Sequence, residues 1–377
     1  MSERRLRFAV VIQTPKDEHS AVYIGYKSLV AALESQGHSV TILAPSDFPT
    51  LARFSGRWTP LLYPLAIASW ARRHGHEFDL LMFHSYSGWL ATAFGHGHPP
   101  ALVMFHGIEP LYHRELREET ARNGDRLSWR YRMLQELYLP YVLGVTCRRA
   151  AGVACLNRTE AEFVRSKGWV SKANVHVLAH GVPPDFFASP RRLGPIRTIL
   201  FVGQWLPMKG IRYLRDAATV LLRHDAGMGL ICAGTLVAED LVKAEFPSEV
   251  RGRIQVLPRL SQSTLSQLYR DADVFVFPSL YEGFSRAIVE AMASRLPIVC
   301  TPVGVAADAL RHEQNALLVS KHDAAALVAA VQRLRSDPAL AERLANAAGE
   351  TAREYTQAAV LQRTMKVVVD AAVNDHE

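Results

Sequence analysis

The sequence predicts an α/β protein that folds as two doubly wound domains, each built on a parallel sheet. Three observations predict this class. In both halves of the 377-residue chain, short apolar runs alternate with amphipathic helical patterns. The runs are continuous rather than alternating with polar residues, which is typical of parallel strands buried on both faces. Residues 181–195 separate the halves, because their four prolines and two glycines favour a linker.

The first half contains the pattern of one such domain. An amphipathic helix over residues 28–38 ends at Gly37, where the chain can turn into the next strand. Two of the predicted strands stop at a histidine, His84 and His106. The predicted strands are residues 7–13, 39–44, 78–85 and 101–107.

The second half repeats the alternation. Strands are predicted at residues 198–203, 228–234, 253–258, 273–279 and 297–302. Helices are predicted at residues 211–224, at 264–270 and from Ser285 onward, and residues 323–377 are nearly all helical by pattern. We therefore predict an N-terminal domain at residues 1–185, a C-terminal domain at 186–354 and a final helical segment at 355–377.

The composition is that of a globular protein with a basic charge balance. The net charge of +7 and the pI near 9.3 favour anionic partners, such as phosphorylated small molecules or anionic lipid surfaces. Nucleic acid fits less well, because the positive charge is spread out and no binding motif occurs. Four scattered cysteines without a CxxC pair favour reduced thiols in a cytoplasmic protein. The longest apolar run, residues 61–71, is too short to span a bilayer.

Two glutamates follow a strand at the edge where this fold class binds ligands. The strand at residues 273–279 runs into PSLYEGFSRAIVEAMA, which places Glu282 in the loop and Glu290 on the next helix. In open parallel sheets, ligands bind beyond the carboxyl ends of the strands. Gly283 would allow a close approach of backbone to a ligand. Taken alone, each carboxylate would more often be a solvated surface residue.

A lysine lies at the same edge of the predicted sheet. Lys209 immediately precedes the helix predicted from residue 211, where the helix dipole disfavours a cation unless an anion is bound beside it. A lysine that simply extends into water is the alternative. Asp271 and Asp273 match the DxD pattern of metal-dependent sugar transfer, but they precede their strand, so capping at the amino end is the expected use. No other cluster has metal-ligand spacing.

These motifs together resemble a known family. The segments FVGQWLPMKGI, LICAG and PSLYEGFSRAIVEAMASRLPIVCTPVG cover much of the second half, and SQGHSVTIL, FDLLMFHS, VMFHG and LAHGVPPDFF extend the likeness more weakly into the first. The sequence resembles the family 4 retaining glycosyltransferases of the GT-B fold, the glycosyl transferases group 1. The resemblance implies two Rossmann-like domains facing across a cleft. The C-terminal domain would bind the donor and the N-terminal domain the acceptor, and residues 355–377 would cross back to the N-terminal domain.

The resemblance also implies a reaction and its residues. A sugar would pass from a nucleoside-diphosphate donor to the hydroxyl of a glycan, lipid-linked or small-molecule acceptor, as in polysaccharide biosynthesis, without a metal or other cofactor. Glu290 would accept hydrogen bonds from the donor ribose, Glu282 would lie near the donor sugar, and Lys209 would neutralise the departing diphosphate. The catalytic candidates are His106, Glu282 and Lys209. The donor-binding candidates are Gly203, Gln204, Lys209, Leu260, Glu282, Gly283, Phe284, Ser285 and Glu290.

The sequence departs from the family pattern at three places, and the first two departures weaken the expected phosphate site. Gln204 occupies the position of the usual arginine, and the glycine pair expected after the first strand is replaced by QTPKDEHSAVY. Arg295 occupies the position of a small residue. Lys16 and Arg295 are the candidates to replace the missing charge. The alternative function is therefore a catalytically degenerate protein of the same fold that binds a nucleotide-sugar or assembles with a partner.

The flanks of the run LLYPLAIA carry basic and aromatic residues. Such a face would suit peripheral docking at the cytoplasmic side of an anionic membrane, while a buried helix with solvated ends is the alternative. The flanking residues are Arg53, Arg57, Trp58, Trp70, Arg72 and Arg73.

Overall fold

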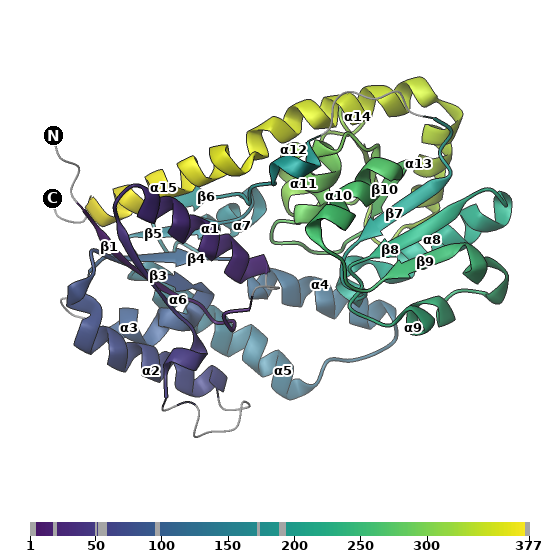
Figure 1. The fold of residues 1–377 in the computed structure, drawn as a ribbon. Coiled ribbons are helices and arrows are strands. Elements are labelled where there is room, and N and C mark those ends of the chain that lie inside the picture. Colours follow the sequence, from purple (N-terminus) through teal and green to yellow (C-terminus); the bar gives the residue numbers. More distant parts are fainter. Residues whose placement is uncertain are drawn as a thin grey trace. The chain divides into compact units, whose positions relative to one another are not determined.

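The computed structural model describes residues 5–17, 21–49, 51, 59–94, 99–171, 174–187 and 194–373. The chain divides into two compact units: the first contains residues 1–180 and 358–377, and the second contains residues 181–357. Each unit is built on one six-stranded sheet, and every strand pair in both sheets is parallel. Figure 1 shows helices on both faces of each sheet, which confirms the predicted fold class.

The first unit has the strand order β2-β1-β3-β4-β5-β6. Its strands are β1 (Arg7–Val11), β2 (Ser39–Leu43), β3 (Leu80–His84), β4 (Ala101–Met104), β5 (Gly152–Cys155) and β6 (Val175–Val177). Its helices are α1 (Ala21–Ser35), α2 (Thr59–His74), α3 (Trp89–Phe94), α4 (Glu109–Arg122), α5 (Trp129–Met133), α6 (Leu139–Arg148), α7 (Arg158–Ser166) and, from Ala358 on, α15 (Gln357–Val373). The sequence patterns did not predict β5, β6 or, in the second unit, the two-residue strand Leu317–Leu318.

Strand β1 joins two cores of the first unit. Successive side chains of a strand point to opposite faces of the sheet. Phe8 and Val10 accordingly pack in one core with side chains of α1 and with Val368 of α15. Ala9 and Val11 pack in the other core, which includes Ile67 of α2. The continuous apolar character of β1 therefore follows from its burial on both faces.

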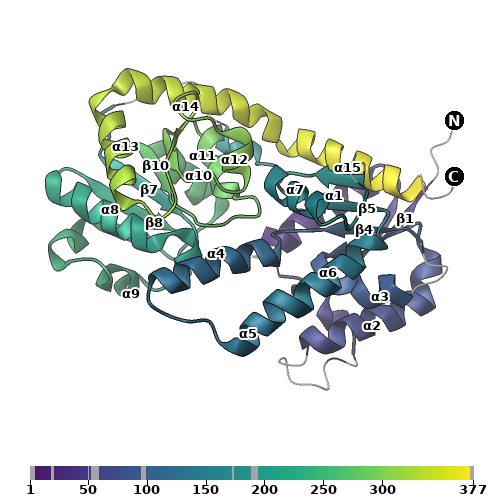
Figure 2. The same ribbon diagram turned by 180° about the vertical axis from the view of Figure 1, so that it is seen from behind.

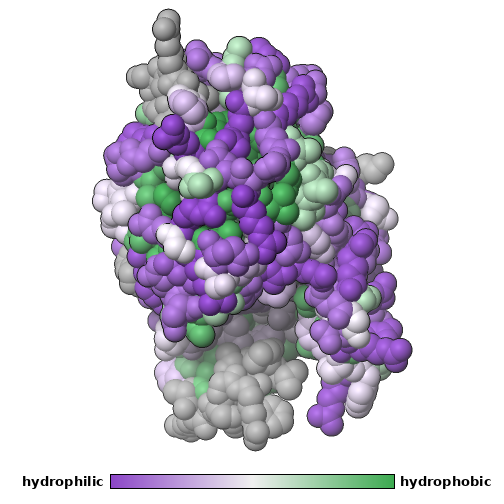
Figure 3. Space-filling view, turned by 90° about the vertical axis from the view of Figure 1, so that its right-hand side faces the viewer, coloured by the Kyte–Doolittle hydropathy of each residue, from purple (hydrophilic) through white to green (hydrophobic). Residues whose placement is uncertain are grey.

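The second unit has the strand order β12-β11-β10-β7-β8-β9. Its strands are β7 (Thr198–Val202), β8 (Gly229–Ala233), β9 (Ile254–Leu257), β10 (Val274–Phe277), β11 (Ile298–Cys300) and β12 (Leu317–Leu318). Its helices are α8 (Ile211–His224), α9 (Glu239–Ala244), α10 (Gln262–Asp271), α11 (Arg286–Ala293), α12 (Val305–Ala309), α13 (Ala324–Ser336) and α14 (Pro338–Ala352). Figure 3, viewed from this unit's side, shows a mainly hydrophilic surface with small hydrophobic areas between polar side chains.

The strand orders define a switch point in each sheet. In the second unit the chain runs from β7 to β8 and β9 on one side, then returns to β10 on the other side of β7. In the first unit β1 has β2 on one side and β3 on the other. Loops diverge at such a point and leave a crevice beyond the carboxyl ends of the two strands, where open α/β sheets bind ligands. The loop with Lys209 follows β7 and the loop with Glu282 follows β10, so both lie at the switch point of the second unit.

We predict that Val368→Asp destabilises the first unit, because Val368 is fully buried in its core. An unpaired carboxylate there should lower the free energy of unfolding by at least about 4 kcal/mol. Val373→Asp is the matched control on the same helix, since Val373 is 48% exposed. Chemical denaturation of both variants is the measurement. Equal stabilities would contradict the packing of α15 on this sheet.

Candidate functional site

A glycine brings the two switch-point loops of the second unit into direct contact. Gly210 has a φ of +70°, and a Cβ atom built on it would lie 1.9 Å from the carbonyl oxygen of Pro278. The Leu280 N–H donates to the carbonyl oxygen of Met208 at 2.9 Å, which ties the same two loops together. Only glycine permits both this φ and this approach. The loops after β7 and β10 therefore form one surface.

Lys209 and Glu282 form an ion pair on this surface. The Lys209 Nζ lies 2.6 Å from the Glu282 Oε1, and the Ser279 hydroxyl lies 2.7 Å from the same oxygen. The Glu282 side chain is 8% exposed and that of Lys209 is 26% exposed, so the pair is largely withdrawn from water. The structure thus brings together two residues that the sequence placed separately at this edge. Glu282 is therefore not a solvated surface residue, and the Lys209 side chain does not simply extend into water.

Glu290 is a buried carboxylate rather than a solvated helix residue. The Tyr269 hydroxyl donates to its Oε2 at 3.1 Å, and the Arg286 Nε lies 3.7 Å from its Oε1. Burial raises the pKa of Glu290, and the nearby Arg286 charge and the Tyr269 hydrogen bond oppose that rise. A buried carboxylate with spare acceptor capacity is well suited to hydroxyl donors such as those of a ribose.

The start of α11 contains two buried polar atoms that make no hydrogen bond with a described residue. Ser285 has a φ of +74°, which is rare for a residue with a side chain. Its Oγ and the Arg286 Nε are buried, and neither makes a hydrogen bond with a described residue. Arg286 was missed by the sequence reasoning. The reason given for Lys209, a cation beside the N-terminus of a helix on the ligand edge, applies equally to Arg286 and would have identified it.

The remaining donor candidates also lie on loops at this edge. Gly203 and Gln204 follow β7, and the Gly203 N–H donates to the Ala233 carbonyl oxygen at the end of β8. Leu260 follows β9. Gly283 and Phe284 are buried, and the Phe284 carbonyl oxygen accepts the Val305 N–H at 2.8 Å. Gly304 lies beneath this loop, because a Cβ there would approach the Glu282 Cβ to 2.7 Å.

Arg295 does not supply the charge missing at Gln204. It is 5% exposed, and its guanidinium donates to the Asn346 carbonyl oxygen at 3.1 Å and to Glu350 on α14. Arg295 was one of two candidates to replace that charge, but its hydrogen bonds join α14 to the end of α11 instead. Lys16 lies in the first unit, 2.9 Å from Asp47.

The DxD aspartates lie at the opposite edge of the sheet. Asp271 ends α10, and the Asp273 carboxylate accepts hydrogen bonds from the backbone N–H groups of Arg197 and Thr198 at 2.9 and 2.8 Å. These bonds fix the start of β7. Asp273 thus has the capping function expected from its place before the strand.

His106 belongs to a cluster of four rings at the switch point of the first unit. The His106 ring centroid lies 5.2 Å from that of Tyr26, 4.7 Å from that of His84 and 5.4 Å from that of His180. The Nδ1 atoms of His84 and His106 and the Tyr26 hydroxyl are buried and make no hydrogen bond with a described residue. Buried polar atoms normally have partners, so this cluster can accept a water molecule or a ligand hydroxyl.

Burial keeps these histidines neutral. Desolvation lowers the pKa of His84 to about 4. The pKa of His106 lies well below its ordinary value, chiefly through burial and further through His84 and His180. A neutral imidazole offers one donor and one acceptor. The cluster is therefore suited to uncharged hydroxyl groups rather than to a phosphate.

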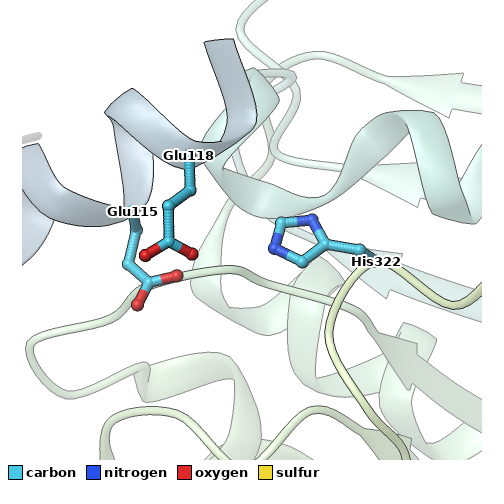
Figure 4. Close-up of side chains that lie close together, drawn as sticks. All are labelled: Glu115, Glu118 and His322. Atoms are coloured by element: carbon cyan, nitrogen blue, oxygen red, sulfur yellow. The ribbon is translucent and has the colours of Figure 1, made fainter. Parts of the chain in front are cut away.

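Helix α4 presents an acidic pair, Glu115 and Glu118, whose side chains project from the same helix in Figure 4. Glu115 is buried and Glu118 is exposed. His322, drawn in the same figure, belongs to the second unit, where its Nδ1 lies 2.9 Å from the Tyr213 hydroxyl. Two carboxylates on one helix are common without an ion, so we assign no metal site to α4.

The apolar run at residues 61–71 is part of α2, and its inner face is core. Tyr63, Ile67 and Ala71 are buried, and Trp70 packs against Phe78. This arrangement agrees with the buried helix that the sequence left as the alternative, and Arg72 and Arg73 at its C-terminal end are exposed. Arg53, Arg57 and Trp58 lie outside the described residues. Among the described helices, none is both long and apolar enough to cross a bilayer.

Two family models match the chain. The model described as Glycosyltransferase Family 4 matches residues 25–186, and the model described as Glycosyl transferases group 1 matches residues 196–337. A D-inositol 3-phosphate glycosyltransferase from Thermomonospora curvata is 31% identical over 194 residues, which are 48% of this chain and 45% of the relative. The chain spans about half the length of the curated relatives that it matches.

Solved structures match over nearly the whole chain. A sucrose-phosphate synthase from Thermosynechococcus elongatus superposes with a TM-score of 0.77 at 20% identity, covering 97% of this chain and 99% of that chain. HepE of Anabaena, solved with UDP and glucose, superposes with a TM-score of 0.70 at 16% identity, covering 97% and 100%. These likenesses establish the shared fold.

We predict that His84→Gln makes the protein less sensitive to acid. The folded pKa of His84, about 4, lies below its ordinary value of 6.5. Between these two pKa values, His84 is protonated in the unfolded chain but neutral in the folded chain. The contribution of the neutral, buried His84 to stability is therefore present above the unfolded pKa and is lost as pH falls toward the folded pKa. Between about pH 7 and about pH 5, the wild type should lose about 2 kcal/mol more unfolding free energy than His84→Gln. Denaturant titrations at both pH values test this, and parallel losses would refute a neutral buried His84.

Proposed function

Because the chain belongs to the glycosyl transferases group 1, the GT-B glycosyltransferases of family 4, we propose that it transfers a sugar from a nucleoside-diphosphate donor to an acceptor hydroxyl with retention of configuration. The observation that carries the proposal is the Lys209–Glu282 pair with buried Glu290 at the switch point of the second unit. In this proposal, the second unit binds the donor. The first unit binds the acceptor.

The site offers separate groups for the two charges that develop during transfer. Negative charge grows on the diphosphate as the glycosidic bond breaks, and a preorganised cation stabilises it. Lys209 fills that role in the proposal. Glu282, 2.6 Å from the Lys209 Nζ, is held beside the departing group, where its carboxylate faces the positive charge on the sugar ring. Because Lys209 and Ser279 already hold the Glu282 Oε1, we assign Glu282 to electrostatic stabilisation and leave deprotonation of the acceptor to the departing phosphate.

Arg286 supplies the second cation of the proposed phosphate site. Lys209 is matched by the charge of Glu282, and Gln204 is neutral, so a bound diphosphate needs further positive charge. Arg286 stands at the first turn of α11, its Nε makes no hydrogen bond with a described residue although it lies 3.7 Å from the Glu290 Oε1, and its side chain is 30% exposed. The dipole of α11 would act on the same anion. We propose that these groups serve without a divalent metal, since the DxD aspartate Asp273 is engaged at the other edge of the sheet.

We assign acceptor binding to the ring cluster of the first unit. His106 would line the reacting sugar, and the partnerless atoms of Tyr26 and His84 would bind hydroxyl groups. A glycan, a lipid-linked saccharide or a small polyol all present such groups, as in polysaccharide biosynthesis. The four cysteines are buried and unpaired, in keeping with a cytoplasmic site of action.

A degenerate nucleotide-sugar-binding protein is the second candidate. Gln204 favours it, because one cation of the usual pair is missing, and Lys209 is already paired with Glu282. Such a protein would bind a nucleoside diphosphate without turnover. HepE, solved with UDP-glucose, makes UDP-glucose the first donor to test in either case.

We predict that the protein releases a nucleoside diphosphate from one member of a donor panel in the presence of EDTA. Lys209→Ala should lower kcat by at least about a hundredfold with a smaller change in donor KM, because the lysine acts mainly on the departing charge. Lys243→Ala is the matched control, since the Lys243–Glu239 pair has a similar length, 2.7 Å, and exposure, 29% for the lysine. Turnover only after addition of Mg²⁺ or Mn²⁺ would overturn metal independence. Binding without release would establish the degenerate protein.

We predict that Arg286→Gln weakens binding of the donor's nucleoside diphosphate by about tenfold or more, through loss of a charge-assisted contact. Adding Gln204→Arg to that variant should restore part of the affinity. Arg223→Gln is the control, because Arg223 is also paired with a glutamate but lies in the last turn of α8. Isothermal titration calorimetry measures all three. An unchanged affinity in Arg286→Gln would exclude Arg286 from the phosphate site.

A further inference from the structure

A row of large apolar side chains lies exposed on the first unit. Trp129, Met133, Leu137 and Tyr141 are 70%, 52%, 60% and 63% exposed. They recur every four residues along the segment formed by α5, the π-helical turn Leu134–Tyr138 and α6. Residues at this spacing share one side of a helix. Single exposed hydrophobic residues are ordinary, but a row of four indicates a contact surface. We call these four residues the apolar stripe.

The neighbouring helices extend this surface. Helix α3 packs against both α2 and α6, and Figures 1 and 2 show these helices together on one side of the first unit's sheet. Leu65 of α2 is 55% exposed and Phe94 of α3 is 67% exposed. The exposed apolar side chains thus come from several adjacent helices rather than from one.

The same helices carry an excess of positive charge. Residues 59–74, 89–94 and 129–148 contain five arginines and one acidic residue, Glu136. Glu136 is paired with Arg117 at 3.3 Å and with Arg132 at 3.5 Å, so four of the five arginines lie outside this pair. The Arg130 guanidinium lies 5.7 Å from the ring centroid of Trp129, beside the stripe. The five arginines are Arg72, Arg73, Arg130, Arg132 and Arg148.

We propose that this face of the first unit docks on the surface of an anionic lipid bilayer. The apolar stripe would enter the boundary between headgroups and acyl chains, where tryptophan and tyrosine are favoured, and the arginines would contact the lipid phosphates. A second copy of the chain fits less well, because a two-fold contact would bring the same arginines together. The inference extends the proposed function by giving the enzyme access to lipid-linked acceptors. Docking does not depend on sugar transfer, so it can be measured separately.

The test is co-sedimentation of the full chain with vesicles. Vesicles of phosphatidylcholine with roughly 30% phosphatidylglycerol should bind the protein, and binding should fall as salt is raised. Leu137→Gln should weaken binding by about tenfold, because it removes one buried apolar side chain. Leu241→Gln is the matched control, since Leu241 is likewise 60% exposed but lies on α9 of the second unit. Arg130→Gln should weaken binding by about fivefold at low salt.

The outcomes separate docking from catalysis. Nucleoside diphosphate release from a soluble donor, measured without vesicles, should be unchanged in Leu137→Gln, because no proposed site residue belongs to α5, the π-helical turn or α6. Failure of that assay in the wild type alone would remove the proposed function and leave docking intact. Equal sedimentation of Leu137→Gln and Leu241→Gln would overturn the proposal. So would a wild-type dimer in analytical ultracentrifugation that Leu137→Gln dissociates, since the stripe would then be a protein interface.

Discussion

The close approach of Gly210 to the Pro278 carbonyl is the constraint on which the donor side of the second unit depends. A Cβ atom would lie 1.9 Å from that oxygen, so any side chain would push the loops after β7 and β10 apart. With the loops in contact, the Leu280 N–H reaches the Met208 carbonyl oxygen, and Lys209 comes within 2.6 Å of Glu282. The ion pair is thus a product of backbone geometry, and the strand order places that geometry at the switch point of the sheet.

The two units prepare their polar groups differently. In the second unit the ionised groups are matched in advance, Lys209 with Glu282 and Arg286 with Glu290. A buried charge is costly unless it is paired, so this arrangement permits low exposure before a ligand arrives. In the first unit the buried Tyr26 hydroxyl and the Nδ1 atoms of His84 and His106 make no hydrogen bond with a described residue. Burial keeps the imidazoles uncharged instead. The ligand edge of the second unit is thus suited to charged groups, and the ring cluster of the first unit is suited to neutral hydroxyls.

The fold class could be predicted from the sequence because buried parallel strands leave continuous apolar runs, as at β1 and β3, where four or more successive residues are buried. Strands β5 and β6 were missed, although strands of the same length, such as β10 and β11, were predicted. The positions of Lys209 and Glu282 followed from the rule that ligands meet the carboxyl ends of strands. Their ion pair did not, because it depends on the contact between two loops far apart in sequence. Arg295 was misjudged for the same reason, since its partners lie on α14. Arg286 was overlooked although its helix position carried the necessary signal.

The path of the chain also bears on the order in which the protein can be completed during synthesis. The second unit is inserted between two segments of the first, because α15 packs with residues that precede residue 181. A ribosome delivers Val368 and Ala372 only after the entire second unit has been made. Until then Phe8 and Val10 lack part of their apolar cover, while the second unit already has all of its strands. The segment of the first unit that emerges earliest is therefore among the last to be fully buried.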